Sequence, residues 1–151
     1  MDDMEEQSRC PECGAKWTGE QTCETCFHQM LFWEAKHPAY GEVHHLTVLC
    51  YHLQHPSLYF PAGLKEGRRL LVEFVEHGAS PAEVRKRNRG RVDSSRRDWK
   101  IKGTAASHGS YEPPVQWTMT AADVIAGGAD HYCDNVRAWA RAINETLKAV
   151  R

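Results

Sequence analysis

CPECG at residues 10–14 and CETC at residues 23–26 are two Cys-x-x-Cys pairs separated by nine residues. A two-residue gap lets both thiolates of a pair reach one ion from a single tight turn, and Gly14 can take the positive φ that such a turn needs. Zinc in structural sites takes four tetrahedral nitrogen or sulfur ligands, and two pairs supply four. The pattern therefore predicts a closed zinc site with the ligands Cys10, Cys13, Cys23 and Cys26.

Two other interpretations of these cysteines stay open. A redox dithiol of the thioredoxin kind places one Cys-x-x-Cys at the start of a helix that follows a buried strand. No strand pattern precedes either pair, which favours the metal. The second alternative concerns the ligand set, because His28 lies two residues beyond Cys26 and is a substitute if that cysteine does not bind the ion.

Composition predicts a soluble globular protein. The chain of 151 residues is 41% hydrophobic and 26% charged, which is ordinary for one domain. Its formal net charge is -1, so strong attraction to a charged partner requires a local patch. No apolar run reaches the ~18 residues that a membrane helix needs, and the acidic residues 1–6 lack the apolar core of a secretory signal. We expect a cytoplasmic protein whose six cysteines serve a metal rather than disulfides.

Apolar residues recur at helical spacing over residues 27–84 and again over residues 119–150. Pro38, Pro56 and Gly78 interrupt the first of these regions, because proline and glycine end helices. The resulting helices are short, with the second at about residues 41–55 and a third starting near Pro61. A fourth, brief helix is predicted by the capping pattern Ser80-Pro81-Ala82-Glu83.

The helix predicted at about residues 41–55 has two different faces. At 100° per residue its apolar face consists of Leu46, Leu49, Cys50 and Leu53. Its other face carries His44, Val48, Tyr51, His52 and His55. These histidines either bond to neighbouring loops or take part in acid/base chemistry or a second metal site. With His131 brought in from the C-terminal region, the catalytic candidates are His52, His55 and His131.

Residues 85–102 form the most basic stretch, with nine cations against Asp93 and Asp98, a net +7. Its glycines and serines favour a loop, and the alternation over residues 98–102 is also compatible with a short edge strand. Arginine forks bind phosphate, and tryptophan can stack on a base. The phosphate-binding candidates are Arg85, Arg87, Arg89, Arg96, Arg97 and Trp99. The alternative is a solvated basic loop without a partner.

The C-terminal region follows an irregular connection rich in glycine, serine and proline. A capping pattern at Thr120 opens a helix that Gly127 and Gly128 interrupt. The last helix has an apolar stripe at 3–4 spacing, made of Tyr132, Val136, Trp139, Ala140, Ile143, Leu147 and Val150. The sequence thus predicts one mainly α-helical domain, residues 1–151, with zinc knuckles at 10–26, helices at 27–84, a basic irregular segment or short hairpin within 85–118 and helices at 119–150.

Four blocks together resemble an uncharacterised bacterial family known only as a domain of unknown function: CPECG, HHLxVxCYxLQHPS, MTAADV and NVRAWA, at residues 10–14, 44–57, 119–124 and 135–140. The resemblance spans nearly the whole chain. It implies a small soluble bacterial protein with a metal-binding N-terminus and no assigned reaction. In that pattern position 26 is less regularly cysteine than positions 10, 13 and 23, which makes His28 or His44 an alternative fourth ligand.

Three functions are compatible with these features. The first is a zinc-stapled helical protein that binds a phosphate-rich or nucleic-acid partner through residues 85–102. The second is a metal-dependent hydrolase or transferase that uses the helix histidines. The third is a non-catalytic interaction module, in which the acidic start and the basic middle pair within a homodimer.

Overall fold

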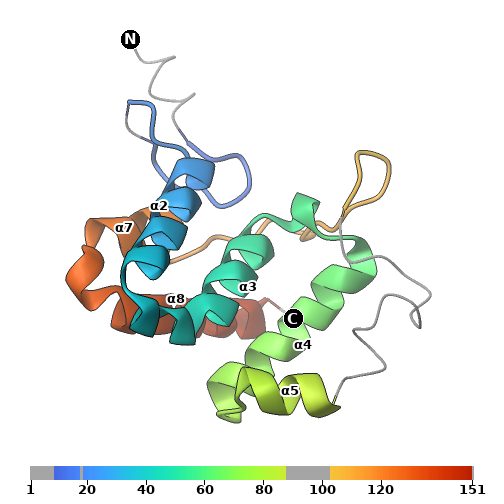
Figure 1. The fold of residues 1–151 in the computed structure, drawn as a ribbon. Helices are drawn as coiled ribbons and strands as arrows, with labels where there is room; N and C mark the ends of the chain where they lie inside the picture. The colour runs from blue at the N-terminus through green and yellow to red at the C-terminus, as the bar shows by residue number, and fades with distance from the viewer. Residues whose placement is uncertain (1–8, 18, 88–102, 151) are drawn as a thin grey trace.

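The computed structural model describes residues 9–17, 19–87 and 103–150 of the chain (Figure 1). These residues form helices and one isolated antiparallel bridge, between Arg9 and Lys16. In chain order the helices are α2 (Cys23–Lys36), η1 (Pro38–Val43), α3 (His44–Gln54), η2 (Pro56–Leu58), α4 (Pro61–Glu76), α5 (Pro81–Arg87), α7 (Ala121–Ala126), η3 (Ala129–His131) and α8 (Tyr132–Ala149). The prediction of a mainly α-helical fold is confirmed. The described ranges contain no strand, and residues 98–102, whose sequence is compatible with a loop or a short edge strand, lie outside them.

Helix α8 is the element on which the main core is built. It packs against α3, α4 and α7, and α3 packs in turn against α4 (Figure 1). Trp139 and Tyr132 are its largest fully buried side chains. The predicted stripe of α8 is buried from Tyr132 to Leu147, whereas Val150 is 43% exposed because the helix ends at Ala149, one residue before it. The helical spacing of apolar residues therefore predicted the core face of α8 correctly, except for Val150.

Helix α2 begins at Cys23, four residues before the start that the apolar pattern predicts. Thr22 is its N-cap: the Thr25 N–H donates to Thr22 Oγ1 at 3.2 Å, and the Thr22 N–H donates to Thr25 Oγ1 at 2.7 Å. This capping box satisfies two backbone donors that the first turn of a helix leaves unpaired. The second Cys-x-x-Cys pair is therefore the first turn of a helix rather than a loop knuckle.

Helix α3 turns its predicted apolar face into the core. Leu46, Leu49, Cys50 and Leu53 are all buried. Gly67 of α4 lies opposite this face, and a Cβ at that position would lie 3.2–3.4 Å from side-chain atoms of Tyr59, Leu53 and Leu49. A glycine in the apolar stripe of α4 thus lets α3 and α4 approach closely, at a cost in helix propensity of about 1 kcal/mol relative to alanine.

The irregular connection after residue 103 is held against the end of α3 by polar contacts. The Tyr111 hydroxyl donates to the Leu53 carbonyl at 2.6 Å, and Gln54 Nε2 donates to the Met119 carbonyl at 2.7 Å. The first bond satisfies one of the last carbonyls of α3, and the second satisfies a carbonyl of the connection itself. Among the helices in the described ranges, none combines the length and the apolar character required to cross a bilayer.

Candidate metal centre

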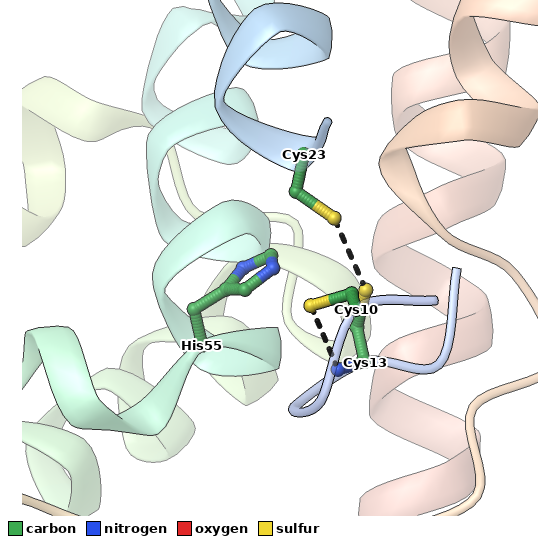
Figure 2. A group of neighbouring side chains, drawn as sticks. All are labelled: Cys10, Cys13, Cys23 and His55. Atoms are coloured by element: carbon green, nitrogen blue, oxygen red, sulfur yellow. Dashed lines mark hydrogen bonds between the residues drawn. The ribbon is translucent and has the colours of Figure 1, made fainter. Parts of the chain in front are cut away.

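Four potential metal ligands converge where the N-terminal segment meets the start of α2 and the end of α3 (Figure 2). They are the sulfur atoms of Cys10, Cys13 and Cys23 and a ring nitrogen of His55. These atoms all lie within 4.8 Å of one another, and all four residues are buried. Three sulfur donors and one imidazole at this spacing could hold a metal ion.

The first Cys-x-x-Cys pair forms a compact turn that aims both sulfur atoms inward. The Cys10 N–H donates to the Ala15 carbonyl at 2.9 Å, and the Gly14 N–H donates to the Cys10 carbonyl at 2.9 Å. Gly14 has φ 76°, the positive value predicted for this turn. The Cys13 N–H points at Cys10 Sγ, 3.4 Å away. Donors of this kind stabilise a thiolate, which is the form that binds metal.

Cys23 enters the group from the first residue of α2. Its sulfur lies 3.4 Å from Cys13 Sγ, and the indole Nε1–H of Trp17 donates to it at 3.3 Å. Because the capping box at Thr22 starts the helix at this residue, the Cα–Cβ bond of Cys23 is fixed by helical backbone. The second donor element is therefore more rigid than a free loop.

His55 is the C-cap of α3, and its ring contributes the fourth donor. Its Nδ1–H donates to the Tyr51 carbonyl at 2.6 Å, which leaves Nε2 as the nitrogen with a free lone pair. Nε2 is buried and has no hydrogen-bond partner among the described residues. Metal-bound histidines almost always donate the other ring N–H to a carbonyl or a carboxylate, which orients the ring. Figure 2 shows the His55 ring pointing toward the three cysteines.

Aromatic stacking brings the His55 end of α3 against α2. The Tyr51 ring lies 4.5 Å from the His55 ring on one side and is stacked on Phe27 on the other, with centroids 4.3 Å apart. Phe27 belongs to α2, one turn after Cys23. The packing of α2 on α3 therefore decides that Cys23 and His55 meet.

The electrostatics of the group favour a cation. Burial lowers the pKa of His55, but the neighbouring sulfur atoms of Cys10 and Cys23 outweigh burial and raise it to about 10. The side chains of Cys13 and Cys23 lower the pKa of Cys10, so Cys10 is the first of the paired thiols to ionise. Without a metal, a proton on His55 compensates this negative charge. A divalent cation would replace that proton and allow more of the thiols to ionise.

The other predicted ligands lie elsewhere. The group does not include Cys26, which is 2% exposed and belongs to the helical core together with Met30. Burial, with the charge of Cys23, raises the pKa of Cys26 to about 11. His28 is exposed, and the exposed His44 bonds through Nδ1 to Glu34 at 2.6 Å. Neither histidine is part of the group.

The catalytic candidates are not brought together as one donor set. His55 is in the metal-binding group, whereas His52 and His131 belong to no group of three or more possible ligands within the described ranges. The half-buried His52 ring packs edge-on against Tyr59 at 5.1 Å. Burial, followed by the charge of His55, lowers the pKa of His52. His131 is exposed at the end of η3.

The phosphate-binding candidates lie largely in the part of the chain that the structure does not describe. Arg89, Arg96, Arg97 and Trp99 fall within residues 88–102, outside the described ranges. Arg85 and Arg87 belong to the short helix α5. A phosphate-rich or nucleic-acid partner for residues 85–102 therefore stays a prediction from the sequence.

Sequence reasoning treated His55 as a catalytic candidate and not as a ligand of the cysteine site. One signal pointed to its special position, because a residue before proline disfavours helical backbone and here it ends α3. That places His55 at a helix end, where a side chain is free to leave the helix surface. The distance of 29 residues from Cys26 along the chain gave no indication that the two elements meet.

Comparison with known protein families identifies the family of this chain. A family model described as "Family of unknown function (DUF5946)" matches residues 8–148, a span that contains all four members of the Cys3His group. No curated protein and no solved structure matches the chain.

Proposed function

The chain belongs to the family of unknown function DUF5946, and from its donor set we propose that it binds one zinc ion through Cys10, Cys13, Cys23 and His55 as a structural centre. The observation that carries the proposal is the buried His55 Nε2, which has no hydrogen-bond partner among the described residues and lies beside three sulfur atoms. In the metal-free protein a proton on His55 faces the sulfur atoms, and a divalent ion bound by Nε2 would take the place of that proton.

The chemistry of the donors selects the metal. Cys3His is one of the tetrahedral ligand sets of structural zinc, and soft thiolates disfavour magnesium and calcium. Four protein ligands leave no open position for a substrate, so the ion holds the protein together rather than activating water. The N–H groups of Trp17 and Cys13 that point at sulfur would offset part of the negative charge of three thiolates.

A matched pair of substitutions tests the ligand set. His55→Ala is expected to reduce bound zinc from about one ion per chain to near zero, whereas Cys26→Ala is expected to leave about one. Loss of a group that only orients a ligand weakens metal binding about 10–100-fold. Loss of the ligand itself should therefore weaken metal binding by a larger factor. Elemental analysis of protein purified without chelator measures the stoichiometry.

His52→Ala is the control for these variants, because His52 is on the same helix as His55 and lies outside the donor group. It should retain the ion. Zinc loss from Cys26→Ala together with retention by His55→Ala would contradict the proposed ligand set and restore the four-cysteine site.

The partner that the sequence predicts for residues 85–102 is a second part of the proposal. We propose a phosphate-rich ligand such as nucleic acid, and the support is the net charge of +7 beside Trp99. A hydrolase or transferase has less support, because His52 and His131 join no donor group in the described ranges.

Salt dependence tests the phosphate partner. Binding of a random-sequence oligonucleotide, followed by fluorescence anisotropy, should weaken steeply between about 50 and 200 mM salt, since phosphate contacts release counterions. The double variant Arg96→Gln, Arg97→Gln should reduce the slope of log K against log salt by about 2 if both arginines contact phosphate. The double variant Lys36→Gln, Lys65→Gln is the control for total charge. No detectable binding at low salt would exclude this partner.

A further inference from the structure

An apolar hollow of about 410 Å³ opens between α3, α4 and α5, remote from the metal centre. Its size falls within the ~300–1,000 Å³ that is usual for small-molecule sites. Val48, Leu70, Phe74 and Val84 supply apolar walls, and His44 and His45 lie at its polar end. His44, at one end of this hollow, is eleven residues from His55 along the chain, which at about 1.5 Å per residue is roughly 16 Å, and none of the four potential metal ligands lines the hollow.

A second hollow of about 230 Å³ adjoins the first and has a different chemistry. His45 and Phe74 line both hollows, with their rings 4.5 Å apart in an edge-on contact. The second hollow adds Arg137 and Arg141 of α8. A molecule that spans His45 would therefore contact apolar walls at one end and arginines at the other.

The two arginines differ in the charge that they can offer. Arg137 is already paired with Glu42 at 2.9 Å and lies 3.8 Å from Asp134. Arg141 is exposed and has no ion-pair partner among the described residues, so its guanidinium is available to an anion. Glu42 is the carboxylate among the residues that line this hollow, and its pairing with Arg137 reduces its repulsion of an anionic ligand.

His45, between the two hollows, can serve as a hydrogen-bond donor. It is half-buried, and burial, followed by the charges of His44 and Arg137, lowers its pKa. The neutral ring carries one N–H donor and one acceptor nitrogen. A carboxylate accepts from both an imidazole N–H and a guanidinium fork, whereas an alcohol matches the fork poorly.

We propose that the two hollows form one binding site for a small amphipathic carboxylate, with the apolar chain between α3, α4 and α5 and the carboxylate between His45 and Arg141. The charge of Arg141 beside an apolar cavity selects this class over a neutral apolar molecule. Nothing in the site depends on the zinc centre, so the two proposals stand or fall separately.

Calorimetric titration with octanoate and with 1-octanol tests the site in the full-length protein as purified without chelator. Octanoate is expected to bind measurably, and 1-octanol at least about fivefold more weakly, the factor that ~1 kcal/mol of charge interaction supplies. Arg141→Glu should weaken octanoate about fivefold and leave 1-octanol unchanged. Lys65→Glu, an exposed charge reversal away from the site, should change neither.

Filling the cavity gives a second, independent arm. Val48→Trp should weaken octanoate binding more than about tenfold, because an indole would occupy the apolar hollow. Val72→Trp is the matched control, since Val72 is also half-buried but faces a hollow on another side of α4. Circular dichroism confirms that both variants are folded.

Three results would overturn the proposal. The first is the absence of octanoate binding to the wild-type protein at millimolar concentration. The second is equal binding of octanoate and 1-octanol that Arg141→Glu leaves unchanged, which would assign a merely apolar cavity. The third is self-association of the protein that Val48→Trp abolishes, that Val72→Trp leaves intact and that octanoate does not affect. This result would assign the hollow to a second copy of the chain.

Discussion

Chelation of the proposed zinc ion is expected to lower the thermal midpoint of the protein by about 10 °C. A ligand present at about 1,000 times its dissociation constant stabilises the folded state by ~4 kcal/mol, and in a chain of this size each kcal/mol shifts the midpoint by about 2–4 °C. The effect is large because the buried cluster between the N-terminal segment and the helices consists mainly of the proposed ligands, with Tyr51, Trp117 and Ala122 packed against it.

The contacts of that segment explain this dependence. Its small cluster of buried residues consists of Cys10, Cys13, Ala15 and Cys23, so three of its four members are proposed ligands. Outside the turn itself, one further tie to the helical body is the Ser57 N–H, which donates to Glu12 Oε1 at 3.0 Å. Without the ion, the three thiols and the imidazole stay buried but no longer share bonds to a common metal. The cluster then loses the interactions that connect its members.

Two measurements check the prediction. Differential scanning calorimetry with and without chelator gives the midpoint, and limited trypsin digestion reports whether the exposed Lys16 becomes a cleavage site. The Cys10→Ser variant is the control, because it should already lack the ion and its midpoint should not respond to chelator. An unchanged midpoint in the chelated wild-type protein would show that the ion is not structural.

The Trp139→Ala variant is expected to lose ~3–5 kcal/mol of unfolding free energy while retaining one zinc ion. Trp139 is fully buried at the centre of α8, so truncation leaves a cavity that the surrounding helices fill only in part. Its indole Nε1–H also donates to Gln54 Oε1 at 3.1 Å, and that buried amide would lose a partner. Urea unfolding followed by circular dichroism measures the loss, and elemental analysis measures the zinc.

Two further variants separate the contribution of the buried apolar volume of Trp139 from that of its hydrogen bond and provide a surface control. Trp139→Phe keeps most of the apolar volume and removes the hydrogen bond, so it should cost less than Trp139→Ala. Phe32→Ala is the surface control, because Phe32 is 53% exposed and contacts Lys36, and it should lie within about 0.5 kcal/mol of wild type. A Trp139→Ala variant within ~1 kcal/mol of wild type would contradict the assignment of α8 as the centre of the core.

The two predictions rest on two neighbouring clusters of buried residues. The larger is formed by the helices, and the smaller surrounds the metal centre. Tyr51, Trp117 and Ala122 contact both. The large cluster contains none of the four proposed ligands, so the helices pack on one another directly. The proposed ion would therefore attach the N-terminal segment to a helical body rather than be the foundation of the whole fold.

Much of the helical structure was predictable because it is determined locally. The buried residues of α8 from Tyr132 to Leu147 recur at helical spacing, and the capping pattern at Thr120 forms the predicted reciprocal bonds with Asp123. The start of α2 was missed because cysteines carry no helical apolar stripe. There the Thr22–Thr25 capping box, and not periodicity, sets the helix start.

By itself, the sequence determined that the chain is mainly helical and that cysteines which could bind a metal, Cys10, Cys13 and Cys23 among them, are grouped near its N-terminal end. Only the tertiary structure decided the fourth donor, placing His55 in the group and Cys26 in the helical core. The physical reason is that ligand choice depends on how α2 crosses α3. That crossing is set by contacts such as Tyr51 on Phe27, between residues 24 apart in the chain, which no local spacing rule describes.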